Sequence, residues 1–401
     1  MNDDSASPMT PGALVYPLEA PPTPGGTLEV APGVHWIRMP MPYALDHINV
    51  WAIAEEGGWA VVDTGLRTDP AAAIWNEWLQ RGGERRRVTR VFVTHMHPDH
   101  VGMAGWLTRT NDCRLWMTRG EYYNCRVTMA DTGLEAPDDA IRFYRQAGWS
   151  DHAIDLYRAR FGRFGQHVHA LPASFRRLRD GEEIRIGAHV WRVLTGSGHS
   201  PEHACFYCPE LKLLISGDQV LPRISSNVSV YPVEPDADPM ADWLASIEKF
   251  KAHVPDDVLV LPAHNDCYRG LHARLDRLAS GQQRSLERLR RSLTEPKRAV
   301  DVFSTLFARP IGEAQISEMG LATGESLACL NYLMRRGEVT RELRDDGAMW
   351  YAMAGRQESR KQPVPIPRNV SPSRTMKNAS RLCCLAKSRP ASMPRTINAV
   401  A

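Results

Sequence analysis

The chain has 401 residues, 43% of them hydrophobic and 24% charged, with a formal net charge of +3. Because a single hydrophobic core rarely grows beyond about 250 to 300 residues, we expect two folded parts. The nearly balanced charge excludes a global field that would mark a nucleic-acid or membrane partner.

No apolar run reaches the roughly 18 residues that a membrane span needs, and the first residues lack the basic and apolar regions of a secretory signal. We therefore predict a cytoplasmic protein without a membrane partner. Residues 1–26 are rich in proline, serine and glycine, which predicts a disordered N-terminus.

Short stretches of alternating polarity then predict an antiparallel meander, over Val34–Met39, Ile48–Ile53 and Trp59–Asp63. From Ala71 the pattern changes to strands that alternate with helices, and the last of these strands covers Val258–Pro262. Mixed sheets layered with helices are the usual solution for such a pattern, so we predict the α/β class.

Between about residues 120 and 175 the strand signal disappears, which predicts a helical insertion lying over one end of the sheet. Two later helices are predicted over Lys297–Ala308 and Ser326–Met334, followed by a hairpin. This order indicates a small winged-helix-like domain over 294–354. The basic residues 355–401 are predicted to be a disordered tail.

A cluster of metal-ligand residue types follows the apolar strand Val88–Thr94. It consists of His95, His97, Asp99 and His100. Imidazoles and carboxylates are typical ligands of zinc and similar divalent ions, and two histidines two residues apart face the same side of an extended backbone. Such clustering favours a metal site over unrelated surface or core histidines.

Four residues cannot complete two metal sites, which together need about seven or eight donors. Three later apolar strands each end in one polar residue beside small turn residues, namely His199, Asp218 and His264. Each alone would also fit a helix cap or a core residue. Asp63, at the end of an earlier strand, is expected to orient a ligand imidazole from behind.

In this order the residues resemble the motifs of the metallo-β-lactamase superfamily, over roughly Gly26 to Leu293. The resemblance implies an αββα sandwich as the catalytic domain, over 27–293. It also implies two divalent metal ions, with zinc expected first and iron or manganese as alternatives. By this resemblance His95, His97 and His199 hold the first ion, Asp99, His100 and His264 hold the second, and Asp218 bridges them.

Departures from other branches of the superfamily narrow the expected function. Class B β-lactamases have a cysteine where Asp218 stands, and flavodiiron proteins have an acidic residue at the position of His97. Glyoxalase II-like thioesterases, which are hydroxyacylglutathione hydrolases, and acyl lactonases share the metal set. Glyoxalase II usually has a glycine where this chain has Glu202. The C-terminal part looks like the winged-helix cap of lactamase-β-like hydrolases.

The leading hypothesis is a metal-dependent hydrolase that uses a metal-bridging hydroxide to cleave a small thioester or ester. Asp99 is the expected catalytic residue, because it would orient the hydroxide, and Arg223 and His203 are candidate contacts of the acyl substrate. The alternatives are a lactonase and a nuclease that uses the winged helix. The nuclease is disfavoured because Ser326–Met334 is mostly apolar, so packing or a homodimer role suits that helix better.

Overall fold

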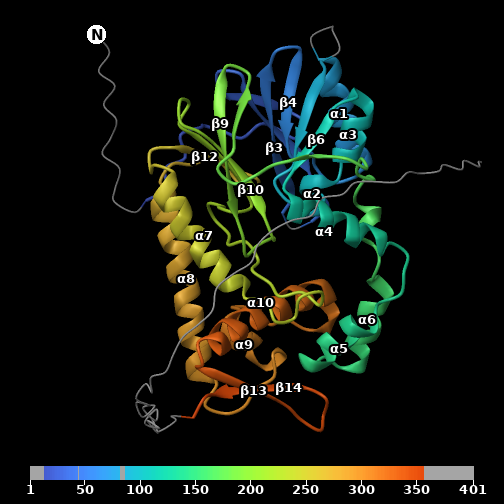
Figure 1. Cartoon of the computed structure of the whole chain (residues 1–401), viewed down its shortest axis with the longest axis vertical. Helices are drawn as coiled ribbons and strands as arrows, with labels where there is room; N and C mark the ends of the chain where they lie inside the picture. The colour runs from blue at the N-terminus through green and yellow to red at the C-terminus, as the bar shows by residue number, and fades with distance from the viewer. Residues whose placement is uncertain (1–12, 44, 82–85, 356–401) are drawn as a thin grey trace, which may run out of the picture. The chain divides into compact units, whose positions relative to one another are not determined.

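The computed structural model describes residues 13–43, 45–81 and 86–355. Two β-sheets pack face to face, and helices cover their outer faces (Figure 1). The first sheet has seven strands in the order β1-β2-β3-β4-β5-β6-β7, and the second has five in the order β12-β11-β10-β9-β8. The predicted α/β class with αββα layers is confirmed.

The first sheet consists of β1 (Thr27–Ala31), β2 (Val34–Pro40), β3 (His47–Glu55), β4 (Gly58–Val62), β5 (Val88–Phe92), β6 (Arg114–Met117) and β7 (Arg176–Arg177). The second consists of β8 (Glu183–Ile186), β9 (His189–Gly196), β10 (His203–Cys208), β11 (Leu213–Gly217) and β12 (Leu259–Pro262). Strand β4 runs parallel to β5, and β11 runs parallel to β12. The carboxyl ends of parallel neighbours meet at the same edge of a sheet.

Three apolar cores separate the four layers. Neighbouring strand residues point to opposite faces, so Trp36 enters the core between the sheets while Ile37 enters the core beneath α1. A third core contains Trp243 and lies between the second sheet and its helices. The covering helices are α1 (Asp69–Gln80) and α3 (Ala104–Asn111) on the first sheet, and α7 (Pro239–His253) and α8 (Leu271–Ser292) on the second.

The helical insertion contains α4 (Arg119–Ala130), α5 (Asp138–Gln146), α6 (Asp151–Arg160) and the short 3-10 helix η1 (Phe164–Gln166). Helices α5 and α6 do not cover the end of a sheet as expected. They lie beside the C-terminal helix α10 (Ile316–Arg335), as Figure 1 shows. The indole N–H of Trp149 donates a hydrogen bond to the Thr323 hydroxyl on α10, at 2.9 Å.

The C-terminal part contains η2 (Val300–Val302), α9 (Phe303–Leu306), η3 (Glu313–Gln315), α10 and the predicted hairpin of β13 (Val339–Leu343) and β14 (Met349–Met353). The helix expected over Lys297–Ala308 is only the short pair η2 and α9. The helix expected over Ser326–Met334 is the second half of the 20-residue α10. Gly320 and Gly324 weakened its sequence signal, since glycine costs about 1 kcal/mol in a helix, but tertiary packing overrides that cost.

Residues 13–26, which we expected to be disordered, have defined positions. Val15 and Arg269 exchange backbone hydrogen bonds of 3.2 and 2.8 Å, and the Gly25 N–H donates to the Arg38 carbonyl at 2.8 Å. The rest of the predicted disorder, in 1–12 and 356–401, lies outside the described residues. Within the described ranges, no helix combines the length and the apolar character that crossing a bilayer requires.

Candidate metal centre

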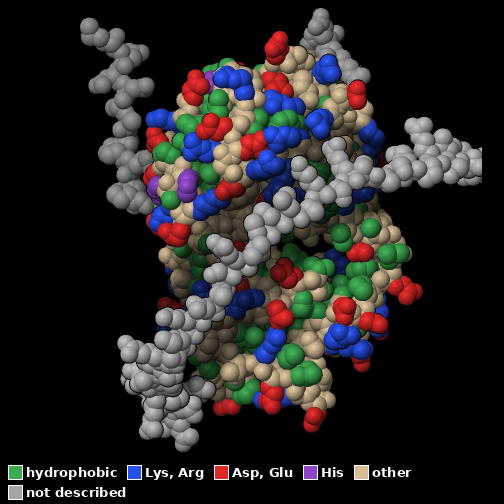
Figure 2. Space-filling view, in the orientation of Figure 1, with side chains coloured by type: hydrophobic (Ala, Val, Ile, Leu, Met, Phe, Trp, Pro, Cys, Tyr) green, Lys and Arg blue, Asp and Glu red, His purple; other side chains and the backbone are tan. Residues whose placement is uncertain are grey.

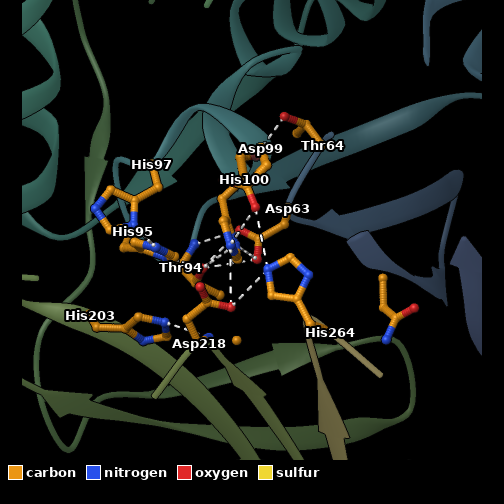
Figure 3. Close-up of polar contacts among 12 residues, drawn as sticks. Asp63, Thr64, Thr94, His95, His97, Asp99, His100, His203, Asp218 and His264 are labelled. Atoms are coloured by element: carbon orange, nitrogen blue, oxygen red, sulfur yellow. Dashed lines mark hydrogen bonds and ion pairs between the residues drawn. The ribbon is translucent and has the colours of Figure 1, made fainter. Parts of the chain in front are cut away.

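The candidate ligands converge at one edge of the sandwich, where the strands that carry them end (Figure 3). His95 and His97 follow β5, and the four-residue helix α2 (Pro98–Val101) carries Asp99 and His100. In the second sheet, His199, Asp218 and His264 follow β9, β11 and β12. The structure therefore brings all seven sequence-predicted ligands to one place.

These side chains form two groups, within each of which the potential ligand atoms lie within 4.8 Å of one another. The first group is His95, His97, His199 and Asp218, and the second group is Asp99, His100 and His264. In the first group, His95 Nε2 lies 2.8 Å from His97 Nδ1 and 3.3 Å from His199 Nε2. In the second, Asp99 Oδ2 lies 3.5 Å from His100 Nε2 and 3.4 Å from His264 Nε2.

Asp218 lies between the two groups. Its Oδ2 is 3.5 Å from His199 Nε2 in the first group. Its Oδ1 is 3.5 Å from His100 Nε2 and 3.4 Å from His264 Nε2 in the second group. A carboxylate that turns one oxygen toward each of two donor groups has the arrangement of a bridging ligand in a two-metal site.

Three of the imidazoles are oriented from behind by an acceptor that binds their Nδ1–H. In the neutral imidazole, the form that binds a metal ion, this bond fixes the tautomer and leaves the Nε2 lone pair facing the site. The bonds join His100 to Asp63 Oδ2 at 2.8 Å, His199 to the Asn227 carbonyl at 2.8 Å and His264 to the His47 carbonyl at 2.9 Å. Asp63 thus contacts the imidazole of His100 on the side away from the other candidate ligands, and its role in orienting a metal ligand stays a prediction.

The protonation of the first group fits metal binding. Burial lowers the pKa of His97 to about 3, and burial together with the neighbouring imidazoles lowers the pKa of His95 well below its usual value. Both imidazoles are therefore neutral at physiological pH, which is the form that binds a metal ion.

Three carboxylates surround His100 of the second group. Burial alone would lower the pKa of His100, but Asp99, Asp63 and Asp218 raise it well above its usual value. His100 Nε2 and Asp218 Oδ1 are buried and have no hydrogen-bond partner among the described residues. Buried polar atoms are rarely left unpaired, and a divalent cation between these two would satisfy both. The donors present thus fit two divalent ions.

Residues 43–264 match the family model of the metallo-beta-lactamase superfamily, and residues 286–354 match that of the metallo-beta-lactamase-like C-terminal domain. The chain belongs to the metallo-β-lactamase superfamily. It is 40% identical to a solved beta-lactamase domain protein from Burkholderia ambifaria, with a TM-score of 0.77 over 85% of this chain and 98% of that one.

Two curated relatives are similar to this superfamily member over part of its length. A probable metallo-hydrolase of Bacillus subtilis, YflN, is 26% identical over 49% of this chain and 67% of its own. The human acyl-coenzyme A thioesterase MBLAC2 is 26% identical over 62% of this chain and 83% of its own.

The two predicted substrate contacts have other partners within the chain. His203 is fully buried, and its Nε2 accepts a hydrogen bond of 3.1 Å from the Asp218 N–H, so it supports the loop that carries this ligand. Its ring stacks on that of His95 at 4.7 Å. Arg223 forms an ion pair of 3.0 Å with Asp266. The burial of His203 leaves no surface for a substrate, which corrects that expectation.

Glu121, at the start of α4, is a supporting residue that sequence analysis missed. Its fully buried carboxylate accepts hydrogen bonds from the Met96 N–H at 2.9 Å and the Glu202 N–H at 2.8 Å. Met96 lies between His95 and His97, and Glu202 lies in the loop after His199. Glu121 therefore joins the two loops that carry the histidines of the first group. No spacing in the sequence connects it with either loop.

Replacing Glu121 with alanine is expected to lower the free energy of unfolding of the metal-free protein by about 2 to 4 kcal/mol, since two buried N–H groups lose their acceptor. Urea unfolding monitored by circular dichroism measures this change. Glu77→Ala is the control, because Glu77 forms an exposed ion pair with Arg81 and has no other ion pair within the described ranges. It should change stability by less than about 1 kcal/mol. Equal effects of the two substitutions would contradict the assigned role.

Proposed function

We propose that this superfamily member hydrolyses a small acyl thioester or ester with two divalent metal ions, zinc first among the candidates. The observation that carries the proposal is the position of Asp218, whose two carboxylate oxygens face different donor groups. Two divalent ions in such a site supply a nucleophilic hydroxide at neutral pH and polarise the substrate carbonyl.

The residues of the chain have separable tasks in this proposal. The neutral imidazoles of His95 and His97 supply nitrogen donors without introducing charge. Asp99 is the proposed catalytic residue. Its side chain is 19% exposed, so a water molecule can reach it, whereas the side chain of His100 beside it is fully buried. Burial alone would raise the pKa of Asp99, but His100 and His264 lower it, so Asp99 is an ionised acceptor for an incoming water molecule.

The place of the site also supports a small-molecule substrate. Figure 2 shows the surface hollowed between the sandwich and the helices of the C-terminal part, and α2 lies at the edge of the sandwich that faces those helices. The named activity of the human relative favours a thioester over a lactone. The nuclease alternative is disfavoured further, because the residues of α10 from Ala322 to Leu333 are buried within the chain, with only Glu325 partly exposed.

The proposal is tested by thiol release from an acyl-coenzyme A and from a hydroxyacylglutathione, beside a matched oxygen ester, an acyl lactone and a phosphodiester. We expect thioester or ester hydrolysis that disappears after chelation and returns with added Zn²⁺, iron or manganese. Metal analysis of the reactivated protein should give about two ions per chain. A metal-loaded protein that cleaves only the lactone or the phosphodiester would contradict the proposal.

A further inference from the structure

The segment from Ser226 to Val230 supports two of the candidate ligands. The Asn227 carbonyl accepts the Nδ1–H of His199 at 2.8 Å. The Ser226 hydroxyl donates to the backbone carbonyl of Asp218. We call residues 226–230 the support segment. A displacement of this segment would move both His199 and Asp218, which belong to the first group.

The support segment in turn rests on α10, about a hundred residues further along the chain. The Asn227 side-chain amide donates to Glu325 Oε2 at 3.0 Å, and the Val230 N–H donates to the Gly324 carbonyl at 3.0 Å. A Cβ atom on Gly324 would lie 2.8 Å from the Ser229 side chain and from the Val230 carbonyl oxygen. Only glycine therefore allows the segment to approach α10 this closely.

Helix α10 is itself held in place by several contacts. Beside its apolar packing, its Asn331 side chain donates to the carbonyls of Pro235 and Ala237 at 3.0 and 2.9 Å. Its Thr323 hydroxyl binds the Trp149 indole at 2.9 Å. Between Thr323 and Asn331 the helix thus contacts the insertion, the support segment and the chain that leads into α7.

We propose that α10 is a structural part of the metal centre, with Gly324 and Glu325 as positioning residues that set the Asn227 carbonyl and, through it, the imidazole of His199. This inference rests on the proposed two-metal site. Binding of a divalent ion by the first group and docking of the support segment on α10 then stabilise each other, because energetic coupling between two sites is reciprocal. The C-terminal part would then contribute to catalysis by positioning a metal ligand, without contacting the substrate.

Two glycines of α10 provide a matched experiment. Zn²⁺ affinity of the full-length metal-free protein is measured by competition with a chromogenic chelator, and Co²⁺ absorption reports the ligand geometry. Gly324→Ala should lower the Zn²⁺ affinity of the tighter of the two sites, or of both, by about 10- to 100-fold. This is the usual loss when a residue that orients a metal ligand is disturbed. Gly320→Ala should leave affinity unchanged, because the nearest side chain to its Cβ in the described part of the chain is Tyr144, with Oη at 4.0 Å.

Glu325 provides a second pair of variants that introduces no steric clash. Glu325→Ala removes the acceptor of the Asn227 amide and should also weaken Zn²⁺ binding. Glu325→Gln should restore it, because the glutamine carbonyl can still accept this bond. Burial raises the pKa of Glu325 to about 7, so the neutral glutamine resembles the protonated side chain.

Hydrogen exchange tests the reciprocal effect, since Zn²⁺ should slow exchange of the amides of α10 and of Val230 in the wild-type chain. The inference is overturned if Gly324→Ala and Glu325→Ala bind Zn²⁺ as the wild type does, or if Zn²⁺ leaves exchange in α10 unchanged. A wild-type chain that binds no divalent ion would instead overturn the proposed function, and the inference with it. If the wild type binds metal and the variants bind it with the same affinity, the proposed function still stands.

Discussion

Replacing Asp218 with alanine is expected to reduce the metal content from about two ions per chain to less than one. Among the described residues, the substitution removes the one carboxylate that faces both donor groups, with Oδ2 toward His199 and Oδ1 toward His100 and His264. Removing a residue that only orients a metal ligand typically costs about 10- to 100-fold in activity. Loss of the ligand Asp218 itself should reduce the rate of hydrolysis by more than that. Elemental analysis after dialysis against Zn²⁺, followed by the thioester assay, measures both effects.

Asp257→Ala is the matched control for this variant. Asp257 and its partner Lys212 lie at the opposite ends of β12 and β11 from the site, and their ion pair is exposed. The change in formal charge is the same, but metal content and hydrolysis should not change. If Asp218→Ala retained two ions per chain, Asp218 would not bridge them.

The second large effect is expected for Asp63→Asn, which should deplete the second group of metal while the first group retains its ion. Asp63 accepts the Thr94 N–H at Oδ1, at 2.8 Å, and the His100 Nδ1–H at Oδ2, at 2.8 Å. The two donors bind at different oxygens of Asp63, and an asparagine has an oxygen at only one of these two positions. The backbone N–H cannot change, whereas His100 can move its proton to Nε2 and accept at Nδ1.

A proton on Nε2 removes the lone pair that faces Asp99 and Asp218. Metal affinity of the second group should therefore fall by about 10- to 100-fold. Chelator competition and Co²⁺ spectra distinguish loss of one ion from loss of both. Unfolding of the metal-free variant should show a smaller effect, about 1 to 3 kcal/mol.

Asp112→Asn is a suitable control, since Asp112 shares the rare left-handed backbone of Asp63, with φ of 46° against 60°. Asp112 is exposed at the end of α3. The same chemical change in the same backbone conformation should leave the metal content unchanged. Similar metal loss in both variants would indicate a general effect of the substitution rather than a tautomer change at His100.

The sequence pattern predicted the strands of the first sheet well because each strand encodes its own two faces, whereas the sandwich of two sheets came from the resemblance to the superfamily. The meander from Val34 to Asp63 alternates in polarity along the chain, and it forms β2, β3 and β4. Prediction was poorer where packing overrides local preference. Helix α10 contains two glycines and extends ten residues further toward the N-terminus than its apolar stretch indicated. Helices α5 and α6 were recognised as helical, but their position beside α10 follows from contacts distant in sequence.

By itself the sequence determined which seven side chains could bind metal, because each follows an apolar strand, and strand ends are local features of the chain. The resemblance to the superfamily already implied how these residues divide into two groups and that Asp218 faces both. Only the tertiary structure decided that His203 lies beneath the ligands. It also decided which residues support them. Glu121 and Glu325 contact segments 81 and 98 residues away. Such contacts leave no periodic pattern in the sequence, because they depend on how separate elements pack together.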